Sequence, residues 1–101
     1  ELAFFADILS AEEADRFGLL NRVVPDGQLD AFVADWCDKL LALPPIALAQ
    51  SKRMLNNAMQ VTMEEALDDE GIAQSVNFST KDTAEAISAW LQKRTPTFKG
   101  R

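Results

Sequence analysis

The chain contains no histidine and a single cysteine, Cys37, among its 101 residues. The absence of histidine removes the side chain that most often acts as a general base or a metal ligand near neutral pH, and it excludes a Ser-His-Asp set. One cysteine cannot form an internal disulfide bond, which is typical of a reducing compartment, so we expect a cytoplasmic protein. We interpret Cys37, next to Trp36 in an amphipathic segment, as a packing residue.

Long apolar runs and an excess of positive charge are also missing. The longest apolar stretches are a few residues, far short of a membrane span. The formal net charge of −6 argues against nucleic acid or an anionic membrane as the main partner. No secretory signal peptide is visible. The composition, 48% hydrophobic and 26% charged, is typical of a folded protein, and 101 residues allow no more than one small domain.

The sequence offers few chemical motifs. The four glycines are scattered and form no phosphate-binding loop. Three acidic groups could be read as a metal cluster, but adjacent positions of a helix point apart, so we interpret them as a solvated acidic face. These groups are Glu12-Glu13, Glu64-Glu65 and Asp68-Asp69-Glu70. We therefore predict neither a catalytic residue nor a metal site within the chain.

Helical periodicity and helix-capping signals dominate, and they predict an all-α fold of about five helices. Residues 1–7 have the pattern of a helical stub. Ser10 and Glu13 form a capping-box pattern that begins a short helix, and Gly18 is suited to end it. Apolar and β-branched residues at 20–24, followed by a proline, indicate a short extended connection.

Two longer helices are expected in the middle of the chain. The first starts near Asp26 and ends before the proline pair at 44–45, because apolar residues recur there at steps of three or four. These residues are Leu29, Phe32, Val33, Trp36 and Leu40. The second helix covers roughly residues 45–60 and has a proline at its first position, where proline is favoured.

Two more helices follow. The stretch Thr62-Met63-Glu64-Glu65 is a second capping box and opens a helix that reaches about Asn77. Gly71 within it costs about 1 kcal/mol relative to alanine, which indicates tight packing or a bend at that point. Ser79 or Thr80 caps the last helix.

The positive charge gathers at the end of the chain. Residues 86–101 hold four of the ten cationic side chains and no acid. Lys93 and Arg94 are expected to close the last helix, where each complements the helix dipole by typically 0.3–1 kcal/mol. Lys99 and Arg101 lie beyond the proline that ends this helix. Either they belong to a flexible cationic terminus, or an anion binds there.

Four segments, in their order and spacing, resemble the crotonase superfamily of enoyl-CoA hydratases and isomerases. They are SAEEADRFGLLNRVVP at 10–25, PPIAL with a following lysine at 44–52, EEAL with a following glutamate at 64–70, and FSTKDTAEAISAWLQKRTPTFKGR at 78–101. Together they extend over the whole chain. The resemblance implies the helical C-terminal oligomerisation region that follows an α/β core of repeated ββα turns.

The resemblance assigns residues 1–25 to the end of a helix next to the core, a capped helix and a short connection. Residues 26–101 become the helical C-terminal trimerisation region. The chain begins at Glu1 without a methionine or a capping residue, so we expect a C-terminal fragment of a longer protein. The family's oxyanion-hole amides and acid/base glutamates would lie upstream, and the parent would assemble as a trimer or a dimer of trimers.

The resemblance also implies a ligand. In family members an aromatic residue and a lysine near the end of the last helix reach the coenzyme A of a neighbouring subunit, at the adenine and at a phosphate. Those positions match Trp90 and Lys93, which are three residues apart and so are expected on one helix face. Lys99 would add to the positive field, and Arg94 would point elsewhere, into a salt bridge. The implied ligand is an acyl-CoA thioester substrate, with no prosthetic group.

The chain departs from the family pattern at three positions. Ala6 and Ala86 stand where glycine is usual, and Trp90 replaces a phenylalanine. The larger indole can keep the contact with adenine or fill a subunit interface. These departures leave the subfamily, and with it the substrate, open.

Three functions are compatible with this sequence. The first is a hydratase that adds water syn across a 2-enoyl-CoA, to which this chain supplies oligomer packing and a coenzyme A contact. The second is another reaction of the same family, such as an enoyl-CoA isomerase or a thioester hydrolase. The third is a non-enzymatic helical interaction module, because amphipathic helices leave apolar surface for a partner.

Overall fold

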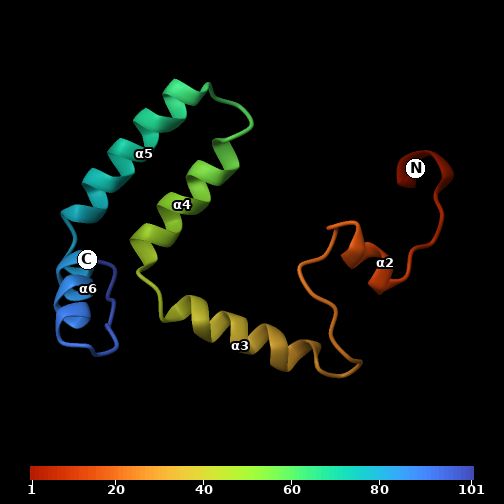
Figure 1. Cartoon of the computed structure of the whole chain (residues 1–101), viewed down its shortest axis with the longest axis horizontal. Coiled ribbons are helices and arrows are strands. Elements are labelled where there is room, and N and C mark those ends of the chain that lie inside the picture. Colours follow the sequence, from red (N-terminus) through yellow and green to blue (C-terminus); the bar gives the residue numbers. More distant parts are fainter. The chain divides into compact units, whose positions relative to one another are not determined.

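The computed structural model describes residues 1–101 and contains six helices and no strand (Figure 1). It divides into two compact units, Glu1–Trp36 and Cys37–Arg101, and each is described by itself. The all-α prediction is confirmed, and residues 20–24 are non-helical as expected. The helices are α1 (Leu2–Phe5), α2 (Ala11–Arg16), α3 (Leu29–Leu41), α4 (Pro45–Asn57), α5 (Met63–Phe78) and α6 (Lys81–Leu91).

The N-terminal unit forms α2 by the two signals that its sequence carries. The Ser10 hydroxyl accepts a hydrogen bond from the Glu13 N–H at 3.2 Å, and the Glu13 carboxylate accepts one from the Ser10 N–H at 2.9 Å. The hydrogen bond from the Ser10 backbone holds the pKa of Glu13 below its ordinary value. At the other end Gly18 adopts a φ of 74°, which a glycine tolerates without strain. Both predictions for this helix are confirmed.

The start of α3 differs from the expectation. The helix begins at Leu29 and not near Asp26. The Gln28 N–H donates to the Pro25 carbonyl at 3.1 Å, and Gly27 has a φ of 79°. A glycine with positive φ at the third position is typical of a type II turn, so this four-residue turn precedes the helix.

The C-terminal unit places α4 and α5 side by side (Figure 1). Pro45 occupies the first turn of α4, and the Thr62 capping box opens α5, both as predicted. Arg53 of α4 and Asp69 of α5 join the two helices by paired hydrogen bonds of 2.8 and 2.7 Å. Such a bidentate pair fixes the geometry of the contact between the two helices and adds the modest energy of a surface ion pair.

The helices α5 and α6 contact each other, and each contains one fully buried alanine. Ala73 of α5 is 0% exposed and Ala89 of α6 is 1% exposed. Thr80 caps α6, since its hydroxyl accepts a hydrogen bond from the Thr83 N–H at 3.2 Å. Gly71 is exposed, and a Cβ atom there would meet no atom within 4 Å. Of the two alternatives expected at Gly71, tight packing or a bend, tight packing is therefore not present within the chain.

Most large apolar side chains are exposed. Ile8 is 98% exposed, Met59 93% and Phe4 90%, whereas the buried residues are two alanines and Asp82. Two alanines remove little apolar area from water, so this chain buries almost no core of its own. Exposed apolar surface on this scale is typical of surfaces that bind other protein. None of the helices has the length and apolar character needed to cross a lipid bilayer.

Candidate functional site

The candidate site lies where α6 ends. The helix ends at Leu91, so Lys93 and Arg94 lie beyond it. The expectation that they form its last turn is therefore wrong. The Lys93 N–H donates to the Trp90 carbonyl at 3.1 Å, and the Arg94 N–H donates to the Ala89 carbonyl at 3.0 Å. These two bonds form a Schellman motif, which satisfies carbonyls that the helix end leaves without a partner.

Lys93 holds the position that glycine usually takes in this motif. Its φ is 54°, in the left-handed region. A side chain with a Cβ atom pays roughly 1–2 kcal/mol for this conformation. Because the backbone reverses at Lys93, the expectation that Trp90 and Lys93 share one face of a continuing helix is wrong. The link between them is the hydrogen bond from the Lys93 N–H to the Trp90 carbonyl.

The side chains of Trp90 and Lys93 are both free to meet a ligand. Trp90 is 79% exposed, and Lys93 is exposed and forms no ion pair within the chain. An exposed indole offers a flat apolar face, and an ammonium offers up to three hydrogen-bond donors. The pair therefore suits a ligand that has an aromatic ring and an anionic group.

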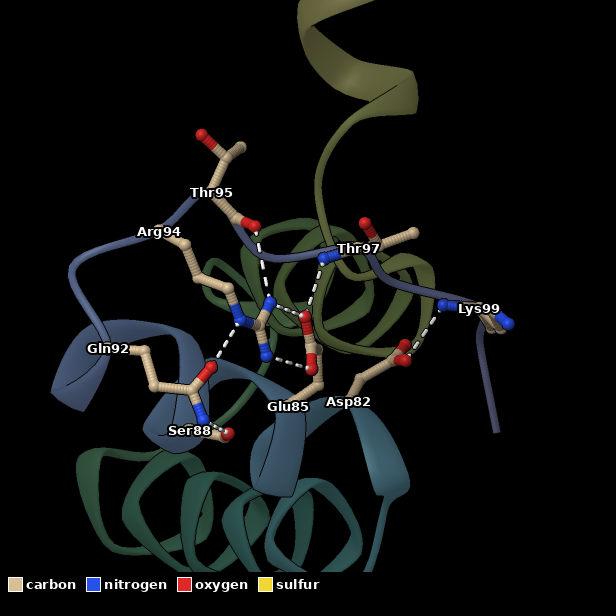
Figure 2. Close-up of polar contacts among 8 residues, drawn as sticks. All are labelled: Asp82, Glu85, Ser88, Gln92, Arg94, Thr95, Thr97 and Lys99. Atoms are coloured by element: carbon tan, nitrogen blue, oxygen red, sulfur yellow. Dashed lines mark hydrogen bonds and ion pairs between the residues drawn. The ribbon is translucent and has the colours of Figure 1, made fainter.

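Arg94 is committed to a salt bridge, as expected. Its guanidinium donates to both carboxylate oxygens of Glu85 at 2.5 and 2.8 Å, as Figure 2 shows. Glu85 also accepts a hydrogen bond from the Thr97 N–H at 3.0 Å. The bonds from Arg94, followed by the one from Thr97, lower the pKa of Glu85 to about 2. Arg94 therefore orders the turn after α6 and is not available to a ligand.

The end of the chain is tied to the first turn of α6. Asp82 is 5% exposed, and one of its oxygens accepts a hydrogen bond from the Lys99 N–H at 2.8 Å (Figure 2). Its other oxygen accepts a hydrogen bond from the Gly100 N–H at 2.7 Å. The Lys81 N–H donates to the Arg101 carbonyl at 2.7 Å. The structure thus has no freely extended cationic terminus.

The three candidate residues do not converge on one point. Lys99 is anchored through Asp82 near the start of α6, while Trp90 lies in its last turn. Eight residues of helix separate Asp82 from Trp90, which is about 12 Å along the axis at 1.5 Å per residue. Lys99 lines an open apolar hollow of about 740 Å³ at the end of α3 and the start of α4. Only an extended ligand could contact both places.

Asp82 and Glu85 are the functional candidates that the sequence did not reveal. They are three residues apart near the start of α6, which puts them on one face. The available signal was the pairing of this acidic face with a short cationic segment that follows a proline. Local periodicity cannot specify such a contact, because up to 18 residues separate the partners.

Comparison with known proteins gives a consistent match. The family model described as enoyl-CoA hydratase/isomerase matches residues 1–101. The chain is 35% identical over 94 residues to the short-chain-enoyl-CoA hydratase of Clostridium acetobutylicum, covering 93% of this chain and 36% of the relative. It is 34% identical over 98 residues to the crotonyl-CoA hydratase of Syntrophomonas wolfei, covering 97% and 38%.

Solved structures agree with these relatives. An enoyl-CoA hydratase of Mycobacterium marinum superposes with a TM-score of 0.88 at 30% identity, covering 99% of this chain and 40% of that one. One from Bacillus anthracis gives 0.86 at 34% identity, covering 92% and 36%. The chain spans 36–38% of the length of the two curated relatives above.

Proposed function

Because the chain belongs to the enoyl-CoA hydratase/isomerase family, we propose that it is the C-terminal helical region of an enzyme that adds water syn across a 2-enoyl-CoA thioester. The chain contributes no reacting group to this step. Backbone amides that stabilise the thioester enolate and glutamates that transfer protons would belong to the rest of the protein. This chain binds the coenzyme A part of a substrate held by a neighbouring subunit, and it packs the subunits together.

The observation that carries this role is that the indole of Trp90 and the ammonium of Lys93 are both exposed at the end of α6, and that this ammonium forms no ion pair within the chain. The indole face can stack on adenine, and the ammonium can form charge-assisted hydrogen bonds with a nucleotide phosphate. A phosphate near the C-terminal end of a helix would meet the negative end of its dipole. The positive charge of Lys93 lies at that same end and offsets this repulsion.

The backbone of Lys93 supports the same role. Glycine would remove the strain of a φ of 54°. A lysine kept in a strained conformation suggests that its side chain is used. Lys99, with its ammonium unpaired at the rim of an apolar hollow, supplies a second cation to the same extended ligand. We propose no prosthetic group, and the cytoplasm as the compartment, since Cys37 is a free and exposed thiol.

The test uses the full-length protein that contains this chain. We expect it to hydrate crotonyl-CoA, measured by loss of the enoyl-thioester absorbance. Lys93→Ala should raise the KM for the CoA ester about fivefold, the equivalent of about 1 kcal/mol for one exposed ion pair, and leave kcat within about twofold. Lys52→Ala, an exposed lysine of α4, is the control. An unchanged KM in Lys93→Ala would remove this residue from the binding site.

A second reaction of the family has a specific observation in its favour. The chain is 33% identical over 100 residues to the 1,2-epoxyphenylacetyl-CoA isomerase of Escherichia coli, close to its identity with the hydratases. Isomerisation would use the same coenzyme A contact with a different core. Assays with 2-enoyl, 3-enoyl and epoxyacyl thioesters separate the two reactions. If the enzyme converts only the 3-enoyl and epoxyacyl thioesters, the isomerase assignment replaces the hydratase assignment.

A further inference from the structure

Two carboxylates of α6 hold the C-terminal segment 94–101 in place. Asp82 binds the segment only through backbone N–H groups, those of Lys99 and Gly100. Glu85 binds the guanidinium of Arg94 and the backbone of Thr97. We call this arrangement the tail clasp. Because Asp82 is 5% exposed, it is shielded from water, and charge-assisted hydrogen bonds are stronger in such surroundings.

The clasp also fits closely against α4. Gly100 has a φ of 68°, and a Cβ atom there would lie 2.8 Å from Cγ of Pro45. A residue other than glycine would therefore be both strained and in collision with the proline ring. The Lys81 N–H, which begins α6, closes the ring of contacts by donating to the Arg101 carbonyl at 2.7 Å. The path of residues 99–101 is fixed independently of the Lys99 side chain.

The side chain of Lys99 is left exposed and without an ion-pair partner by this arrangement. It stands at an apolar hollow of about 740 Å³, whose lining includes Leu40, Leu48 and Phe98. We propose that Asp82 is a positioning residue for acyl-CoA binding, which holds the backbone of Lys99 so that its ammonium meets the anionic part of the thioester ligand. This inference rests on the proposed function. It assigns a role to a carboxylate that itself touches no substrate.

The test is a double-mutant cycle in the full-length protein with crotonyl-CoA as the substrate. Lys99→Ala removes the ammonium and keeps the clasp, because the clasp uses the Lys99 backbone. Asp82→Ala removes the part of the clasp that holds the Lys99 and Gly100 backbones, and it keeps the ammonium. We expect each to raise KM about fivefold with kcat nearly unchanged. The double variant should be no worse than either single variant, because both changes abolish the same interaction.

Two further variants open the clasp and keep the test valid if the Asp82→Ala protein does not fold. Gly100→Ala leaves both carboxylates intact and displaces the segment sterically, and Asp82→Asn is the mildest change. Trypsin cleavage after Lys99 should become faster in each variant. Glu65→Ala removes a carboxylate that accepts a backbone N–H in a different helix. Glu65→Ala should lower the melting temperature without changing KM. If Asp82 had only a structural role, Asp82→Ala would give the same result.

The outcomes separate the two proposals. If Lys93→Ala raises KM and Lys99→Ala does not, the coenzyme A contact stands and the role of Asp82 is refuted. If Lys99→Ala raises KM but the clasp variants speed cleavage with KM unchanged, positioning is likewise refuted. Additive effects in the double variant count against it as well. If neither lysine variant affects KM, the proposed coenzyme A contact is wrong, and this inference falls with it.

Discussion

Two residues other than glycine, Ala6 and Lys93, have left-handed backbones, each with a φ of 54°. Ala6 follows α1, and its left-handed conformation is one that glycine adopts without strain. Lys93 ends α6 in the same manner. Both residues carry a similar conformational cost, but only Lys93 has a charged side chain. Comparing glycine substitutions at the two positions therefore separates the effect of backbone strain on stability from the effect of the Lys93 side chain on binding.

Lys93→Gly should therefore stabilise the fold and weaken binding. Relief of roughly 1–2 kcal/mol of strain exceeds the roughly 0.4–1 kcal/mol by which glycine favours the unfolded chain, so the free energy of unfolding should rise by about 0.5–1 kcal/mol. The KM for the CoA ester should rise as it does in Lys93→Ala. Urea unfolding and steady-state kinetics measure the two effects. Ala6→Gly, the control, should show the gain in stability alone.

The pKa of Glu85 gives the fold a dependence on acid. Its pKa is about 2 in the folded protein, compared with an ordinary value of 4.5. A group with a lowered folded-state pKa stabilises the fold above its unfolded pKa, and this contribution is lost as pH falls through the folded value. Stability should decline between about pH 4.5 and pH 2. Glu85→Gln should be less stable than the wild type at pH 7, and the difference should shrink across that window in thermal melts. A difference that is constant with pH would show that the Glu85 charge does not matter.

At the scale of elements, the helix ends follow from short signals in the sequence. The capping boxes at Ser10 and Thr62 and the first-turn proline of α4 lie where they were expected. These signals depend on residues three or four positions apart, so they survive any change of tertiary context. The errors are the start of α3, where a turn takes the residues around Gly27, and the end of α6, where a left-handed lysine stops the helix before its proline.

Gly71 in α5 makes a prediction at this scale. Because no atom lies within 4 Å of a Cβ built there, Gly71→Ala should stabilise the isolated chain by about 1 kcal/mol, the difference in helix propensity. Urea unfolding followed by circular dichroism measures this change. The same substitution in the full-length protein reports on contacts from outside the chain: destabilisation there would mean that this face of α5 is covered. A loss of stability in the isolated chain would contradict the open surroundings of Gly71.

At the scale of the molecule, the apolar surface exceeds what a solitary chain of this size can support. Residues on α1, α3, α4, α5 and α6 contribute to it, among them Phe5, Leu41, Leu55, Met63 and Leu91, each at least 68% exposed. Contact with other protein would remove this area from water, at about 25 cal/mol per Å². The incomplete coverage of the relatives is consistent with surfaces that the rest of the protein, or other subunits, would cover.

The isolated chain should therefore self-associate. Light scattering coupled to size exclusion should give a dimer or trimer, with a mass that falls on dilution because the contacts are not the native ones. Adding salt should not dissociate it, since apolar burial is insensitive to charge screening. A monomer with a cooperative thermal transition would contradict the exposed-surface interpretation.

The sequence by itself determined the helical class, most helix boundaries, the family resemblance and the involvement of Arg94 in a salt bridge. The helical class and the helix boundaries depend on residue types at short spacing, and the resemblance depends on the order and spacing of four segments, so all of these can be read directly from the chain. The tertiary structure alone decided that the C-terminal segment returns to α6, that Asp82 is buried beneath it, and that Lys93 and Lys99 are held at opposite ends of one helix. Those features join residues far apart in sequence, and the chain must fold back on itself before their hydrogen bonds can form.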